Sequence, residues 1–184
     1  MFYCGIDPGS TCGGAAVLDG SELVWLAQWR RVGNRYRYAY GSPQLASARE
    51  AEAQTLGEAI AACLGPHVGS LRLAAVEAVV RHGGRPAPIA LATAAGVAVG
   101  LLEASGTQVR RPSPAQWRSV YFGAPITLER ARAKRVALDW LHGRQTPAAP
   151  PLRCRSWDVP QGVSWADHAA EATAIAAWLQ ESDS

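Results

Sequence analysis

The first twenty residues alternate apolar runs with turn residues, which predicts two strands joined by a tight turn. Residues 2–6 are apolar, Asp7 follows them directly, residues 8–10 (PGS) form the turn, and residues 13–18 are the second run. Pro and Gly set the backbone angles of such a turn and leave little side-chain bulk around the carboxylate. Because an unpaired buried carboxylate is costly, Asp7 is either a turn cap or a residue with a cationic partner.

Two further segments extend the pattern into a sheet. Residues 22–30 place Leu23, Trp25 and Ala27 on one face and predict a third antiparallel strand. Residues 35–40 (RYRYAY) alternate with period two, so three tyrosines share one face if this segment is extended. That face either stacks on nucleic-acid bases or is the half-buried side of an ordinary hairpin.

A second acidic strand end follows later in the chain. Residues 71–77 (LRLAAVE) are almost continuously apolar, as in a central strand buried on both faces, and end in Glu77. Residues 108–111 (QVRR) predict one more short strand. The pattern therefore predicts an α/β fold with a mixed five-stranded sheet, antiparallel in its first three strands and parallel in its last two, flanked by helices. Two buried strands that each end in an acid are less common than one.

Helical periodicity and composition predict five helices. They are expected over residues 45–64, 88–104, from 113–114 onward, 127–142 and 165–180. In the second of these, Gly96 and Gly100 would let another element approach closely, either within the monomer or across a dimer interface.

The last helix carries three polar side chains near its start. Asp167, His168 and Glu171 stand at positions i, i+1 and i+4, so all three can point from one side of the first turn. Asp167 also lies three residues after Ser164, the spacing of a capping box. The alanines around Glu171 indicate tight packing against a neighbouring element.

Composition indicates one globular domain. The chain has 184 residues, 48% hydrophobic and 18% charged, and we expect a single domain over residues 1–184. It lacks an apolar run of membrane-spanning length and a signal-peptide pattern, so we expect no membrane association and a cytoplasmic location. Its four cysteines show no metal-type spacing and are expected to be reduced thiols.

The order of a meander, a helix, a strand, a helix, a strand and a last helix is that of the ribonuclease H-like fold. This fold would bring Asp7 and Glu77 together with the acids of the last helix. Three or four such ligands can hold two Mg²⁺ ions roughly 4 Å apart, one to activate water and one to stabilise the leaving 3′ oxygen of a phosphodiester. Carboxylates are the ligands that Mg²⁺ prefers.

Three segments resemble a known family. GIDPGSTCGGAAVLD, AAVEAVV and DHAAEATAIAAW resemble the signature segments of RuvC-type Holliday junction resolvases. VRRPSPAQWR followed by RARAKRVALDWL resembles the bacteriophage branch of that family, whose members would act in a bacterial host. The resemblance implies a homodimer that cuts branched DNA, four-way junctions above all, by metal-dependent hydrolysis, with symmetric nicks that leave 5′-phosphates.

The resemblance also implies a ligand set. Asp7 matches the first-strand ligand, Glu77 the central-strand ligand, and His168 and Glu171 the pair on the last helix. The family usually has Asp where this chain has Glu171, a departure that bears on the choice between Mg²⁺ and Mn²⁺. Asp167 remains an alternative to His168 as the nearer metal ligand.

Basic residues supply the predicted DNA-binding surface. The net charge of +3 agrees with nucleic-acid binding without predicting it. Neutralising phosphates with a set of arginines would make binding strongly dependent on salt. The residues expected to bind DNA are Arg81, His82, Arg85, Arg110, Arg111, Arg118 and Lys134.

Other functions remain as alternatives. The same acids would serve a less selective branch or flap nuclease, or a nuclease that cuts RNA–DNA hybrids. A junction-binding scaffold without catalysis is a third class, although it has no need for converging acids. DxGST also opens the phosphate loop of actin-like ATPases, but this chain is too short for their duplicated fold.

Overall fold

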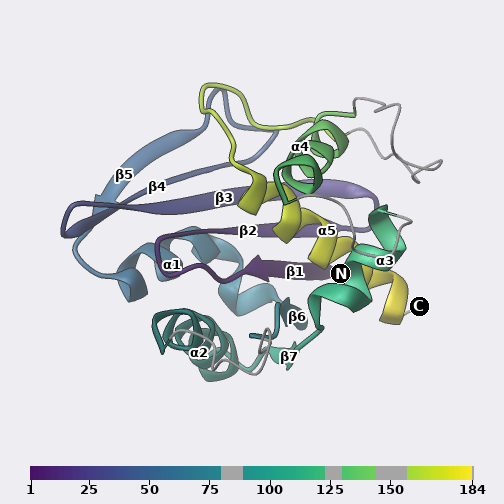
Figure 1. The fold of residues 1–184 in the computed structure, drawn as a ribbon, viewed down its shortest axis with the longest axis horizontal. Coiled ribbons are helices and arrows are strands. Elements are labelled where there is room, and N and C mark those ends of the chain that lie inside the picture. The colour runs from purple at the N-terminus through teal and green to yellow at the C-terminus, as the bar shows by residue number, and fades with distance from the viewer. Residues whose placement is uncertain (80–88, 123–129, 144–156, 184) are drawn as a thin grey trace.

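The computed structural model describes residues 1–79, 89–122, 130–143 and 157–183. Within these ranges the chain forms one seven-stranded mixed sheet with helices on both faces (Figure 1). The strand order across the sheet is β5-β4-β3-β2-β1-β6-β7. The strands are β1 Phe2–Asp7, β2 Cys12–Asp19, β3 Glu22–Val32, β4 Arg35–Gly41, β5 Arg49–Ala53, β6 Leu73–Val76 and β7 Gln108–Arg110.

The antiparallel and parallel halves of the sheet are arranged as the pattern predicts. Strands β1, β2 and β3 form an antiparallel meander, and β6 and β7 run parallel to β1. The turns after β2 and β3 use Gly20 and Gly33, whose φ angles are 56° and 62°. Glycine adopts these angles without steric cost, so each two-residue turn matches the twist of its strands.

The prediction of five strands is wrong, because two further antiparallel strands widen the sheet beyond β3. The alternating tyrosine segment forms β4, and residues 49–53 pair with it as β5, where a helix was expected. Helix α1, Leu56–Leu64, begins only at Thr55, whose side chain forms a capping box with Glu58. Pairing along β4 therefore overrides the helical propensity of the preceding residues.

In the part of the chain that the structure describes, five α-helices flank the sheet together with the short helix η1, Gly65–Ser70. Besides α1 they are α2 Ile89–Ala104, α3 Pro114–Phe122, α4 Arg130–Leu141 and α5 Asp167–Asp183. One face of the sheet packs against α1 and α2, and the other against α3, α4 and α5. The predicted starts at residues 88 and 127 lie outside the described residues. No helix in the described part of the chain has the length and apolarity to cross a membrane.

The tyrosine face of β4 belongs to the core side covered by α1. Tyr40 stacks on Trp25 with ring centroids 5.2 Å apart, and Tyr38 stacks on Tyr40 at 6.0 Å. The hydroxyl of Tyr36 donates to the carbonyl oxygen of Ser10 at 3.0 Å. Of the two interpretations of this segment, the half-buried hairpin face describes what these rings do.

Helix α5 lies against the centre of the sheet, across β1 and β2 (Figure 1). Two glycines allow this close approach. A Cβ at Gly5 would lie 2.1 Å from the carbonyl oxygen of Ala172, and one at Gly14 would lie 2.4 Å from that of His168. Both distances are far below van der Waals contact, so any larger residue would push the helix away from the strands.

We expect Gly5→Ala to lower the free energy of unfolding by about 2 kcal/mol or more, because backbone atoms of α5 must move. Urea denaturation followed by circular dichroism would measure the change. Gly69→Ala is the matched control, since a Cβ there meets no described atom within 4 Å. Equal stability of the two variants would show that α5 does not depend on the small residue beneath it.

Candidate metal centre

Two acidic residues lie at the carboxyl ends of two neighbouring central strands. Asp7 is the last residue of β1, where it pairs with Gly14 of β2. Glu77 directly follows β6, and its backbone N–H donates to the carbonyl oxygen of Ile6 at 3.0 Å. Because β1 and β6 are adjacent and parallel, their carboxyl ends meet, and the two acids lie on neighbouring strands.

Helix α5 adds two more side chains at these strand ends. His168 and Glu171 stand one turn apart on the same helix face. Ligand atoms of Asp7, His168 and Glu171 all lie within 4.8 Å of one another. Nδ1 of His168 contacts Oδ2 of Asp7 directly, and Glu171 is only 8% exposed. The three residues thus form one partly enclosed cluster of nitrogen and oxygen ligands.

Glu77 lies beside this cluster and is held by α3. Its Oε2 accepts a hydrogen bond of 2.9 Å from Nε1 of Trp117, whose side chain is fully buried. Burial raises the pKa of Glu77, and the negative charge of Asp7 raises it further. Trp117 thereby fixes the orientation of a carboxylate that the sheet alone would leave free to rotate.

Arg118 turns toward the acids, although it was predicted to bind DNA at the surface. One of its guanidinium nitrogens lies 2.8 Å from Oε1 of Glu171. The guanidinium also stacks over the indole of Trp117, 4.8 Å from the ring centroid. Arg118 therefore brings a positive charge to the acids and neutralises part of their charge.

The cluster holds its protons tightly. Burial raises the pKa of Glu171 well above its usual range, and the charge of Asp7 adds to the effect, while Arg118 opposes it. Burial alone would lower the pKa of His168, but the hydrogen bond and charge of Asp7 outweigh burial and raise it to about 9. The imidazolium of His168 and the guanidinium of Arg118 thus bring positive charge to acids that also retain protons.

The donor set fits a hard divalent cation. Carboxylates are preferred by Mg²⁺, and one imidazole with carboxylates suits Mn²⁺ as well. Asp7, His168 and Glu171 offer such atoms close enough to share one ion, and Glu77 borders them. The positive charge of a bound ion would take the place of the protons that the cluster otherwise retains.

Asp167, the alternative to His168, lies outside the cluster of Asp7, His168 and Glu171. The helix begins at Asp167 rather than at Trp165. The Asp167 carboxylate instead forms an ion pair of 2.5 Å with Nζ of Lys134 on α4. Lys134 was expected on an exposed DNA-binding face, and here it is half-buried and bound to an acid.

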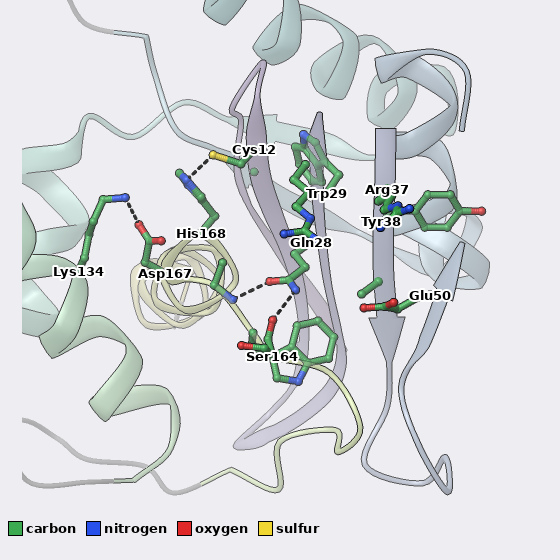
Figure 2. A pocket seen from close by; sticks show the side chains of 15 residues that line it. Cys12, Gln28, Trp29, Arg37, Tyr38, Glu50, Lys134, Ser164, Asp167 and His168 are labelled. Atoms are coloured by element: carbon green, nitrogen blue, oxygen red, sulfur yellow. Dashed lines mark hydrogen bonds and ion pairs between the residues drawn. The ribbon is translucent and has the colours of Figure 1, made fainter. Parts of the chain in front are cut away.

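Cys12 was missed by the sequence reasoning. Its Sγ lies 3.0 Å from Nε2 of His168, on the side of the ring away from Asp7 (Figure 2). A partner on the second ring nitrogen fixes the orientation of a metal-binding histidine. No sequence motif indicates this contact, because Cys12 on β2 and His168 on α5 are 156 positions apart in the chain.

Gln28 was also missed. Its side-chain amide donates to the carbonyl oxygen of Ser164 at 2.8 Å, and its Oε1 accepts from the N–H of Ala166 at 2.6 Å. Both bonds join β3 to the segment that precedes α5 (Figure 2). Gln28 therefore supplies from another strand the acceptor that a capping residue would provide, and it sets where the helix starts.

Two of the remaining predicted DNA-binding residues, Arg110 and Arg111, lie near the end of α5. Arg110 forms an ion pair of 2.9 Å with Asp183 near the end of α5, and Arg111 is exposed beside it. Arg81, His82 and Arg85 lie outside the described residues.

A cavity of about 390 Å³ opens next to His168. It lies between the start of α5 and the outer strands β3 and β4 (Figure 2). Arg30, Arg37 and Lys134 line it, together with the acids Glu50 and Asp167. The candidate cluster thus borders, at His168, a hollow on the widened part of the sheet.

We expect thermal stability without divalent ions to fall as pH rises from about 6 to 9. Glu77 and Glu171 have raised pKa values, so the folded state binds protons more tightly than the unfolded state and loses this advantage as pH increases. The stabilising charge of His168 is lost over the same window, as pH rises through about 9. A shift of one pKa unit is worth about 1.4 kcal/mol, or about 3–6 °C in the melting temperature of a chain of this size.

Mn²⁺ should restore stability, and more so at pH 8.5 than at pH 6, because ions and protons compete for the same atoms. Differential scanning calorimetry with chelator or Mn²⁺ would measure both effects, with Glu103→Gln on the far helix as control. A stabilisation by Mn²⁺ that is absent, or equal at both pH values, would contradict a metal site here.

The comparisons with known proteins give a likeness in structure only. No protein-family model matches the chain, and no curated protein matches its sequence. The structure of Thermus thermophilus RuvC is similar with a TM-score of 0.49 and 18% identity, over 100% of this chain and 97% of that one. T. thermophilus RuvC in complex with a Holliday junction substrate is similar with a TM-score of 0.49 and 18% identity, over 99% and 96%.

Proposed function

We propose that this protein is a metal-dependent DNA endonuclease of the RuvC type that resolves Holliday junctions. The observation that carries the proposal is the convergence of Asp7, His168 and Glu171, beside Glu77, from three elements far apart in the chain. Buried acids that raise one another's pKa are costly to ionise together, so their convergence favours a cationic ligand between them. The resemblance of the three sequence segments that carry these residues supports the same assignment.

The four side chains divide the work of phosphodiester hydrolysis. Asp7, Glu171 and His168 would hold the ion, and Trp117 keeps Glu77 oriented toward them. The bound divalent ions, Mg²⁺ or Mn²⁺, would polarise the phosphate and lower the pKa of the attacking water. Arg118, which lies 2.8 Å from Glu171, is placed to donate to the phosphate oxygens as negative charge develops on them. The products would carry 5′-phosphates.

Nicking of a labelled four-way junction tests the proposal. We expect wild-type protein to make paired symmetric nicks with Mg²⁺ or Mn²⁺, and Asp7→Asn and Glu171→Gln to lose at least about a thousandfold in rate, since each removes a ligand. Glu103→Gln, an exposed acid at the end of α2, is the matched control and should cut normally.

The substrate series separates the alternatives. Cleavage of plain duplex or of an RNA–DNA hybrid at the junction's rate would move the assignment to a less selective nuclease on the same fold. Tight junction binding without cleavage in either metal would contradict the enzyme and favour a scaffold.

We further propose that the protein acts as a homodimer, because paired nicks on opposite strands need two sites. The exposed side of α2 supports this, since a Cβ at Gly96 or Gly100 meets no described atom within 4 Å. These glycines thus do not serve close packing inside the described monomer. Light scattering should give twice the 19.5 kDa of one chain at micromolar concentration. Gly96→Leu should shift the mass toward the monomer, and a monomeric wild type that still makes paired nicks would overturn the dimer.

A further inference from the structure

The hollow beside the metal centre is lined by a row of side chains that runs across the sheet. In the strand registers, Cys12 faces Arg30, Arg30 faces Arg37, and Arg37 faces Glu52. Directly paired residues point to the same face of a sheet, and neighbouring strands lie about 4.8 Å apart. The row therefore leads outward from His168, which contacts Cys12, in steps of one strand.

Two arginines are directly opposite each other in this row. Like charges at such positions destabilise a strand pair unless an anion lies between or beside them. Arg37 has such a partner, because its Nε lies 3.1 Å from Oε1 of Glu52. Arg30 is exposed, and it forms no ion pair with any residue that the structure describes. Its charge is therefore available to an external anion.

Of the basic side chains that line the cavity, Arg37 and Lys134 are in ion pairs, and Arg30 is in none with the residues that the structure describes. Lys134 is engaged by Asp167 at 2.5 Å, at the end of the hollow nearest α5. Glu50, opposite Ala39 on the outer strands, lies in line with neither arginine and marks the other end. Three basic side chains against two acidic ones line the cavity. The hollow thus favours an anion near Arg30.

We propose that Arg30 binds a phosphate of the DNA strand that continues from the metal centre across β3 and β4. The inference rests on the proposed function, since it takes the cut phosphate to lie at Asp7 and Glu171. Arg30 belongs to neither the metal cluster nor the basic residues that the sequence indicated. The guanidinium fork suits a phosphate, and a contact of this kind holds the strand without reading its bases. The strands β4 and β5, which widen the sheet, thereby form the floor of a substrate-binding groove.

Binding measured across a salt series tests this role. The Asp7→Asn protein in chelator is titrated with a fluorescent four-way junction at several NaCl concentrations, with and without Arg30→Gln. We expect Arg30→Gln to weaken binding about three- to tenfold at low salt and to reduce the slope of log affinity against log salt by about 0.9. Arg31→Gln is the matched control, because it removes the same charge from the next residue, on the opposite sheet face, where Nε of Arg31 donates to the carbonyl oxygen of Gly33 in its own turn.

The single variant Arg30→Gln, which keeps Asp7, should gain as much thermal stability from Mn²⁺ as wild type does. This result separates a substrate contact from damage to the metal centre. Equal salt slopes for the Arg30 and Arg31 variants, in a protein that binds and cuts junctions, would overturn the inference and leave the proposed function standing. Binding without cleavage by wild type would count against the proposed function, while the slope comparison would still decide the role of Arg30. Absence of binding to any DNA would overturn both.

Discussion

The close contact between α5 and the first two strands is the constraint on which the site depends. Gly5 and Gly14 let helix backbone approach strand backbone, and this approach places His168 against Asp7. Larger residues at either position would widen the gap by more than the tolerance of a metal site, where ligand distances are set within a few tenths of an ångström. Packing and chemistry are therefore set by the same two positions.

Charge balance is the second constraint. Carboxylates gathered at a half-buried edge repel one another, and the fold counters this with His168, Arg118 and the indole N–H of Trp117. Lys134 similarly neutralises Asp167 at the start of the helix. Each counter-charge comes from a different element, so the acids tie α3, α4 and α5 to the end of the sheet.

Much of the candidate site could be predicted from sequence because its parts have local signatures. Apolar strands that end in Asp7 and Glu77, and the spacing of His168 and Glu171 on one helix face, follow from periodicity alone. Contacts across the fold have no such signature. The direction of Arg118 toward Glu171 and the contact of Cys12 with His168 join residues 53 and 156 positions apart. The strand β5 was missed because its composition favours a helix, and only pairing with β4 makes it extended.

The separation of the site residues along the chain determines when the site can form during synthesis. Asp7 and His168 are 161 positions apart, and Gln28 bonds to residues 136 and 138 positions further on. Closing such long loops is slow and costs chain entropy before the contact is gained. A ribosome-bound chain that has completed the sheet still lacks half of its ligands. The cluster of Asp7, His168 and Glu171 therefore assembles only after α5 has been synthesised and docked, so the last helix to be made is the one that completes the site.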